Sequence, residues 1–357
     1  MDHVETPVGV ADLARARSNA RRVVDYCRDH GLRWRPHIKT HKSLDMAQLQ
    51  LGAGASGLTV ATPHEAEVMS TVCSDLLLAY PPVGARKVER VVGLPPHVDL
   101  KVGLDSREAL VPLAEAAVRR GRVVGVLVEF DAGMGRVGVV EPTSALELAR
   151  LAESLDGVRF DGLMFYPGHI RVPAREQGPM LVALADRVTR FVDCLSDAGL
   201  SPDTVSGGSS PTLWNSHTLP GLTEVRSGTC IYNDRDMVEL DVAGTQDLAY
   251  TVLASVVSVA VPGQAVVDAG SKALAKEPFR SSGDGFGVLL DRPAIKVRAL
   301  SEEHGILDLT DTDWEPRIGD RVRIVPNHVC VSVNLQDHLW GLNEDGLTRV
   351  SLEGRGR

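Results

Sequence analysis

The chain has little of what disulfide-bonded, membrane-spanning or nucleic-acid-binding proteins need. Its five cysteines among 357 residues are an odd number without regular spacing, which excludes a disulfide framework and favours a reducing, cytoplasmic location. No apolar run approaches the roughly 20 residues that span a bilayer. The first residues lack the basic and apolar regions of a signal peptide, so we expect none. The net charge of −9 argues against nucleic acid and anionic membranes as partners.

The sequence does contain short apolar runs that alternate with amphipathic stretches over its first two-thirds. The apolar runs predict eight strands, at 33–39, 57–61, 75–80, 98–104, 123–131, 160–166, 203–206 and 223–231. The amphipathic stretches predict helices at 11–30, 43–51, 63–73, 84–92, 106–120, 142–155 and 178–199, and leave 211–218 ambiguous. Eight strand–helix units in about 230 residues predict an α/β fold, a (β/α)8 TIM-type barrel over residues 11–244. A doubly wound open sheet has the same periodicity and is the alternative.

From about residue 245 the pattern changes to longer, β-branched, alternating runs separated by turn residues. These runs predict strands at 249–261, 264–267, 294–300, 305–309, 321–325 and 347–352, and no stretch predicts a long helix. We therefore expect a separate C-terminal antiparallel β domain at 245–357, which could include residues 1–10. The Gly- and Arg-rich end, residues 353–357, is expected to fray.

Lys39 ends the first predicted strand and is crowded by His37, His41 and Lys42. Schiff-base chemistry needs the neutral amine, which neighbouring cationic groups favour. Because barrel enzymes build their active sites at the carboxyl ends of the strands, Lys39 is a candidate for binding a pyridoxal cofactor. The alternative is that both histidines are core or solvated residues that merely flank a lysine.

Polar loops follow the later predicted strands as well. Residues 131–136 (DAGMGR) follow the fifth strand, 166–169 (YPGH) the sixth and 206–210 (SGGSS) the seventh, and 226–229 (RSGT) lie near the end of the eighth. Glycines let backbone N–H groups approach an anion, and the loops after the last two strands of a barrel commonly bind phosphate, so 207–210 predict a phosphate site. The alternatives are a plain flexible turn at 207–210 and a structural ion pair between Asp131 and Arg136.

His328 and Cys330 lie two residues apart on a segment that we predict to be extended. An imidazole and a thiolate with this spacing can point the same way and chelate one Zn²⁺. Two ligands are too few for a closed structural site, so the other positions would take water, another side chain or substrate. The alternative is a buried core cysteine beside a hydrogen-bonded histidine.

In this order, the segments resemble the fold-type III pyridoxal-phosphate enzymes of the alanine-racemase-like barrel group. Within that group the chain is most similar to the D-serine dehydratase and D-threonine aldolase branch. The resemblance covers nearly the whole chain. It is carried by 35–42 (RPHIKTHK), 61–66 (ATPHEA), 129–138 (EFDAGMGRVG), 166–169, 207–210, 226–229, 232–234 (YND), 268–273 (DAGSKA) and 326–330 (PNHVC).

The resemblance implies roles for individual residues. Lys39 would form the Schiff base with pyridoxal 5′-phosphate, and the 207–210 loop and its neighbours would hold the phosphate. The residues implied to bind the cofactor are His37, Lys39, Arg136, Tyr166, Ser206, Gly207, Gly208, Ser209, Gly228, Thr229 and Tyr232. His328 and Cys330 would bind Zn²⁺ or another divalent cation such as Mn²⁺. The His-x-Cys pair is similar to the zinc site of D-serine dehydratases, whereas the aldolases more often carry His-x-Asp.

The expected function is that of a lyase that eliminates water from a β-hydroxy-D-amino acid, giving an α-keto acid and ammonia. Lys39 would remove the α-proton, and zinc would act as a Lewis acid on the β-hydroxyl. The alternative is retro-aldol cleavage to glycine and an aldehyde, with His169 as the candidate base. A homodimer is expected from the resemblance. A racemase would have no use for a metal at the β-position, and a carrier protein built on the barrel alone would leave the β domain unexplained.

Overall fold

The computed structural model describes residues 4–356, which fall into two compact units. We call residues 21–228 and 353–356 the barrel unit, and residues 4–20 and 229–352 the β unit. Residues 229–244 therefore group with the β unit, although the hydrophobic pattern changes only near residue 245. The domain limits of 11–244 and 245–357 remain a prediction, and residues 1–3 and 357 lie outside the described part of the chain.

Eight parallel strands form the centre of the barrel unit, in the hydrogen-bonded order β2-β9-β8-β7-β6-β5-β4-β3. They are β2 (Arg33–Trp34), β3 (Leu58–Val60), β4 (Asp75–Leu78), β5 (Asp99–Leu104), β6 (Val124–Glu129), β7 (Val158–Met164), β8 (Thr204–Gly207) and β9 (Glu224–Val225). A bridge between His37, just after β2, and Thr59 of β3 joins the two ends of this order. The sheet therefore closes on itself, which confirms the α/β barrel and excludes the open doubly wound sheet.

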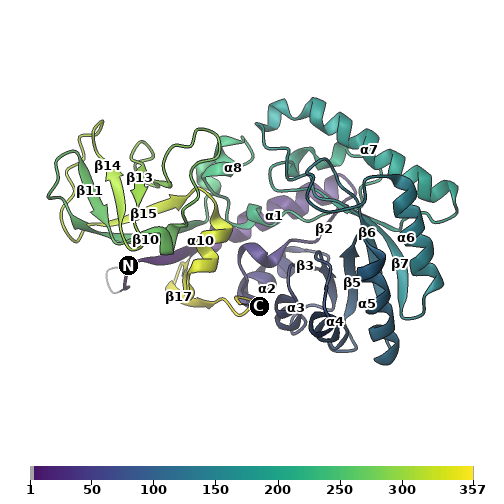
Figure 1. The fold of residues 1–357 in the computed structure, drawn as a ribbon. Helices are drawn as coiled ribbons and strands as arrows, with labels where there is room; N and C mark the ends of the chain where they lie inside the picture. The colour runs from purple at the N-terminus through teal and green to yellow at the C-terminus, as the bar shows by residue number, and fades with distance from the viewer. Residues whose placement is uncertain (1–3, 357) are drawn as a thin grey trace. The chain divides into compact units, whose positions relative to one another are not determined.

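Helices follow the strands where the amphipathic stretches predict them, and they surround the strands (Figure 1). They are α1 (Leu13–Asp29), α2 (Leu44–Ala53), α3 (Pro63–Met69), α4 (Ala85–Val92), α5 (Arg107–Arg119), α6 (Pro142–Ser154) and α7 (Gly178–Asp197), with 3-10 helices η1 (Ile38–Thr40), η2 (Ala174–Glu176) and η3 (Leu213–Thr218). At α3, Pro63 occupies the first turn and Thr62 Oγ1 accepts a hydrogen bond from Glu65 N at 3.1 Å. No helix within the described residues is both long and apolar enough to cross a membrane.

Side chains fill the inside of the barrel. Leu77 of β4, Leu127 of β6 and Met164 of β7 form a buried apolar cluster. Elsewhere in the barrel unit lies a buried polar chain that we call the interior network (Arg35, Glu224, Ser206 and Arg226). Arg35 Nε donates to both carboxylate oxygens of Glu224 at 3.0 Å, Ser206 Oγ donates to Glu224 Oε1 at 2.7 Å, and Arg226 Nη1 donates to Ser206 Oγ at 2.7 Å. Because each buried charge has a partner, the network can remain in the interior.

The β unit is built on a largely antiparallel nine-stranded sheet. Its strands are β1 (Val8–Asp12), β10 (Tyr250–Ser258), β11 (Gln264–Val267), β12 (Gly287–Leu289), β13 (Val297–Leu300), β14 (Gly305–Asp308), β15 (Arg321–Pro326), β16 (His338–Asn343) and β17 (Gly346–Ser351). Strand β1 runs antiparallel to β10 and parallel to β16, and Val8 and Val10 pack with Val4 and Leu253 in the core. The N-terminal segment therefore joins this sheet, as the sequence suggested, whereas β12 and β16 were not predicted.

The β unit also contains short helices that the sequence did not predict. They are η4 (Thr229–Ile231), α8 (Arg235–Glu239), η5 (Thr245–Asp247), α9 (Ser271–Leu274) and α10 (Val329–Leu335). The extended conformation predicted across His328 and Cys330 is therefore wrong, because α10 begins directly after His328. The alternation of Val329, Val331 and Val333 with more polar residues is typical of a strand. In the structure Val329, Ser332 and Val333 are buried, which is the i, i+3, i+4 spacing of a helix face.

The C-terminal end is ordered by contacts that its composition did not reveal. Gly354 N donates to the carbonyl of Lys42 at 2.9 Å, and Leu44 N donates to Glu353 Oε2 at 3.0 Å. His64 Nε2 lies 3.0 Å from the carbonyl of Glu353. The expectation that residues 353–357 fray is therefore wrong for 353 and 354, which hold the segment just after Lys39.

Candidate active site

Lys39 lies in η1, the turn that follows β2 at its carboxyl end. Its side chain is exposed, and its Nζ lies 5.7 Å from the centre of the Tyr166 ring. Lys42 differs, because its Nζ pairs with the buried carboxylate of Glu65 at 2.9 Å. Among the described residues Lys39 has no carboxylate partner. Of the two lysines in this segment, Lys39 therefore has the amine that is available for covalent chemistry.

The two histidines that flank Lys39 are both neutral at pH 7. Burial, together with the positive charges of Lys39 and Arg226, lowers the pKa of His37 well below its usual value. Burial lowers the pKa of His41 to about 4. His41 Nε2 is hydrogen-bonded to Gln50 Oε1 at 3.0 Å, and its Nδ1 accepts from the backbone N–H of residue 43. His41 is therefore a core residue, as the alternative interpretation held.

The loop after β6 is organised by Asp131. Its Oδ1 accepts hydrogen bonds from the backbone N–H groups of residues 133, 134 and 135 at 3.2, 3.0 and 2.9 Å. Among the described residues Asp131 thus binds backbone N–H groups and not Arg136, so the ion pair that the alternative interpretation supposed is not formed. The guanidinium of Arg136 instead lies 5.1 Å from the centre of the Tyr166 ring.

Tyr166, which follows β7, brings the two cationic side chains of the site to one aromatic ring. Both Lys39 and Arg136 lie within about 6 Å of the ring centre, the range of cation–π interactions. His169 is exposed in the same loop, and its ring packs on Gly133, where a Cβ would lie 3.2 Å from two ring atoms. The polar loops after β2, β6 and β7 therefore meet at one end of the barrel.

The loop after β8 is fixed rather than flexible. Gly208 has φ +79°, a conformation that favours glycine, and a Cβ on Gly207 would lie 2.3 Å from the Phe165 ring. Ser209 is buried, and its carbonyl accepts a hydrogen bond from Ser227 Oγ at 2.9 Å. This loop can therefore present its peptide groups in one defined conformation.

Gly228, in the loop after β9, lies against the turn that carries Lys39. A Cβ on Gly228 would be 2.3 Å from the carbonyl oxygen of His37 and 3.1 Å from Thr40 Oγ1. Only glycine permits this approach. Ser206, by contrast, uses its hydroxyl as donor to Glu224 and acceptor from Arg226 within the interior network.

The β unit holds a second group of polar residues, the His328 cluster (Thr229, Asp234, His328 and Cys330). His328 Nδ1 lies 3.3 Å from Asp234 Oδ2, and Thr229 Oγ1 lies 3.7 Å from Cys330 Sγ. Burial lowers the pKa of His328, but the negative charges of Cys330 and Asp234 outweigh it and raise the pKa to about 11. Tyr232 is also in this unit, buried with its ring centre 5.7 Å from that of Tyr250.

The structure thus divides the predicted site residues between the units. The barrel unit holds His37, Lys39, Arg136, Tyr166, His169, Ser206, Gly207, Gly208, Ser209 and Gly228, and the β unit holds Thr229, Tyr232, His328 and Cys330.

Three buried charged residues were not predicted as site residues. Arg226 donates to the Phe165 carbonyl at 2.7 Å and influences His37. Burial raises the pKa of Glu129, at the end of β6, against the opposing effect of Arg226 and Arg136. The Asp234 carboxylate lies 3.3 Å from His328 Nδ1. Each lies in a segment that carries the resemblance, but only the structure gives its partners.

The donor chemistry of both groups fits the cofactors that the sequence implied. The barrel unit offers an amine, an aromatic ring, an arginine and two glycine-bearing loops, which suit a phosphorylated aromatic aldehyde such as pyridoxal phosphate. The imidazole of His328 and the thiol of Cys330 suit zinc. No group of three or more His, Cys, Asp or Glu side chains within residues 4–356 is arranged to hold a metal. The pair would therefore leave coordination positions open, as catalytic metals require.

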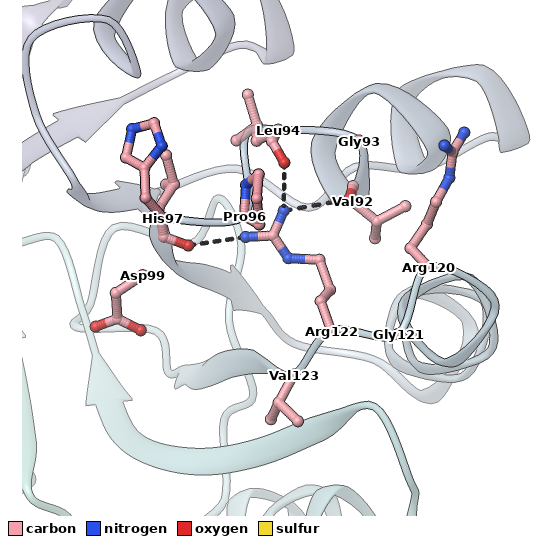
Figure 2. Close-up of a pocket in the computed structure, with 11 residues that line it drawn as sticks. Val92, Gly93, Leu94, Pro96, His97, Asp99, Arg120, Gly121, Arg122 and Val123 are labelled. Atoms are coloured by element: carbon pink, nitrogen blue, oxygen red, sulfur yellow. Dashed lines mark hydrogen bonds between the residues drawn. The ribbon is translucent and has the colours of Figure 1, made fainter.

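A pocket of about 630 Å³ lies elsewhere on the barrel unit, at the amino ends of β5 and β6 (Figure 2). It is lined by residues from 92–99 and 120–123. Arg122 donates to three backbone carbonyls of the first segment at 2.8–3.1 Å. Because this end of a barrel serves stability and Arg122 is committed to the backbone, we do not regard the pocket as the active site.

The closed barrel with its β unit defines the class of alanine-racemase-like folds. The chain belongs to this family: the model "Alanine racemase, N-terminal domain" matches residues 11–236, and the model "Putative serine dehydratase domain" matches residues 249–342. This fold family implies pyridoxal phosphate as the cofactor.

Individual relatives cover almost the entire chain. D-threo-3-hydroxyaspartate dehydratase of Delftia sp. (strain HT23) is 33% identical over 92% of this chain and 92% of its own. The crystal structure of D-threonine aldolase from Filomicrobium marinum is 30% identical with a TM-score of 0.89, covering 100% of this chain and 97% of that one. A cysteine-to-alanine mutant of D-threo-3-hydroxyaspartate dehydratase in the metal-free form is 29% identical with a TM-score of 0.89, covering 98% of each chain. The relatives are thus lyases, either dehydratases or aldolases.

Proposed function

We propose that the chain is a pyridoxal-phosphate- and zinc-dependent lyase of the D-serine dehydratase type. It would eliminate water from a β-hydroxy-D-amino acid to give an α-keto acid and ammonia. The proposal rests mainly on the side-chain interaction between His328 and Cys330. An imidazole and a thiolate together favour zinc over harder cations. A relative that is a dehydratase has been solved in a metal-free form, which supports a metal in this branch.

In the barrel unit, Lys39 would hold the cofactor covalently, with Tyr166, Arg136 and His37 around it. The loop 207–209 and Gly228 would receive the phosphate, and Ser206 would support them from the interior network. When bound, pyridoxal phosphate withdraws electrons from the substrate Cα, and zinc withdraws them from the β-hydroxyl oxygen. Lys39 Nζ would remove the α-proton. A carboxylate beside the amine would favour its protonated form, which cannot act as a base.

In the β unit, His328 and Cys330 would hold the zinc ion, and Thr229 and Tyr232 would contribute further contacts to the cofactor. Zinc is proposed first, and Mn²⁺ is the alternative divalent cation. A thiolate ligand favours zinc over Mn²⁺, which prefers oxygen donors. We further propose a cytoplasmic location and a homodimeric assembly. Light scattering of the purified protein tests the dimer, and fractionation of the cells that produce it tests the location.

Retro-aldol cleavage is the second candidate, because a D-threonine aldolase is similar over the whole chain. In this reaction a base must take the proton of the β-hydroxyl. His169 is exposed in the loop that carries Tyr166, and it would serve as that base.

One assay separates the two reactions. The purified protein, loaded with pyridoxal phosphate and Zn²⁺, is incubated with D-serine, D-threonine and D-threo-3-hydroxyaspartate, and four products are quantified. We expect keto acid and ammonia in equal amounts, with little glycine or aldehyde. Glycine with an aldehyde would show the aldolase, and no product from any of the three would contradict both candidates.

A further inference from the structure

The carboxylate of Asp234 makes more contacts than a helix cap requires. Its Oδ1 accepts a hydrogen bond from Met237 N at 3.0 Å and caps α8. Its Oδ2 accepts from Val329 N at 3.0 Å and lies 3.3 Å from His328 Nδ1. The side chain is completely buried, whereas that of His328 is 22% exposed. Asp234 therefore links the start of α8 to the start of α10.

The position of Asp234 favours one arrangement of the His328 ring. Its carboxylate lies 3.3 Å from Nδ1, so in the metal-bound protein the proton would stay on Nδ1 beside the negative charge, and Nε2 would offer its electron pair to the metal. Both oxygens of Asp234 already face N–H groups, so Asp234 is not itself placed as a ligand. Histidines that bind metals usually have such a second partner, which fixes the tautomer and the ring orientation.

We propose that Asp234 is a positioning residue that presents Nε2 of His328 to the metal ion. The inference rests on the proposed metal role of His328 and Cys330 and adds the residue that orients one of the two ligands. The competing explanation is that Asp234 only caps α8 and anchors the backbone of residue 329.

Serine at position 234 separates the two explanations. Serine is a good helix cap, but its side chain is one carbon shorter and carries no charge, so Asp234→Ser keeps a cap for α8 and removes the carboxylate from His328. Asp247→Ser is the matched control. Asp247 also accepts a backbone N–H at the start of a short helix in the β unit, from Gly244 at 2.8 Å.

The measurement is zinc binding by the full-length protein after removal of metal, in competition with a chromophoric chelator. Asp234→Ser should bind zinc about 10- to 100-fold more weakly than the unmodified chain, the usual effect of losing such a partner. Asp247→Ser should match the unmodified chain. The visible spectrum of bound Co²⁺ should change in Asp234→Ser, because the imidazole is no longer held in one tautomer and orientation. Pyridoxal-phosphate content should stay the same in all three proteins.

Two results would overturn the inference, and they have different consequences for the proposed function. If the unmodified chain binds zinc and Asp234→Ser binds it within twofold with the same Co²⁺ spectrum, Asp234 is only a cap, and the proposed function survives. If the unmodified chain binds no zinc, the inference and the proposed metal role both fail. If Asp234→Ser does not fold, Asp234→Asn is measured in its place. Its amide is neutral, so we expect weaker zinc binding in that variant as well.

Discussion

His37 and His41 of the barrel unit and His328 of the β unit have opposite electrostatic surroundings. In the barrel unit, burial lowers the pKa of both His37 and His41, and the charges of Lys39 and Arg226 lower that of His37 further. In the β unit, the sulfur of Cys330 and the carboxylate of Asp234 raise the pKa of His328 to about 11 despite its burial. His37 and His41 are therefore neutral at pH 7, whereas His328 lies beside two anionic groups.

This difference indicates which kind of group each unit can bind. The barrel unit surrounds Lys39 with cationic and neutral groups, which favours an anionic ligand such as a phosphate. The β unit gathers a thiol and a carboxylate around an imidazole, which favours a metal cation. Variants in each unit should therefore affect different ligands, and the following predictions test that separation.

The largest effect is expected from Lys39→Ala in the barrel unit. This variant should lose the absorption of covalently bound pyridoxal phosphate after dialysis, and its activity should fall about 10³-fold or more, because it loses both the attachment point and the base. Zinc content should be unchanged. The control is Lys42→Arg, which keeps the ion pair with Glu65. Yellow colour that survives dialysis in Lys39→Ala would show that another lysine binds the cofactor.

The next largest effect is expected from Cys330→Ser in the β unit. Loss of the thiolate should reduce zinc content and lower turnover by roughly 10²- to 10³-fold, comparable with the loss of one electrostatic stabiliser of a transition state. Bound pyridoxal phosphate should remain, as should happen when a chelator removes the metal. Cys194→Ser, at a free cysteine of α7, is the control. Full activity after complete metal removal would falsify the proposed role of zinc.

A smaller effect is expected from Gly228→Ala. The new Cβ would meet the His37 carbonyl at 2.3 Å, so the turn that carries Lys39 must move. We expect about 1–3 kcal/mol of lost stability and weaker retention of pyridoxal phosphate, with zinc affinity unchanged. Gly52→Ala in α2 is the control, because nothing lies within 4 Å of its Cβ position and alanine favours a helix. Equal cofactor retention in both variants would mean that the close approach at Gly228 does not position Lys39.

The smallest effect concerns the pH dependence of stability. The folded state holds His41 neutral down to about pH 4, whereas the unfolded chain protonates it near the usual value of 6.5. The unfolded state therefore binds more protons, and stability falls as the pH drops from about 6.5 to about 4. His41→Asn keeps an acceptor for the N–H of residue 43. In this variant the decrease in the free energy of unfolding between about pH 7 and pH 5 should be smaller by roughly 1–2 kcal/mol. Denaturant unfolding at both pH values measures this, and an identical pH slope in the variant would contradict it.

The sequence was sufficient to place most of the regular structure. All eight barrel strands and the seven main helices lie within or close to the predicted ranges, since the alternation of apolar runs and amphipathic stretches is a local property. The first and last strands are much shorter than predicted: β2 ends at Trp34, so Lys39 lies in η1 and not at the end of the strand, and β9 ends at Val225. Residues 329–335 are one of the exceptions, together with β12, β16 and the other short helices of the β unit. The alternating valines of residues 329–335 fit both a strand and a short helix face, and packing on neighbouring residues decides between them.

The sequence by itself determined the residue types of both sites: a lysine at a strand end, glycine-rich loops and a His-x-Cys pair. Only the tertiary structure decided which of them are available. It paired Lys42 with Glu65 and, within residues 4–356, left Lys39 without a carboxylate partner. It also used the Ser206 hydroxyl within the barrel and placed Asp234 beside His328. The reason is that these partners are 18 to 94 residues apart in the chain, and no local pattern records a contact over that distance.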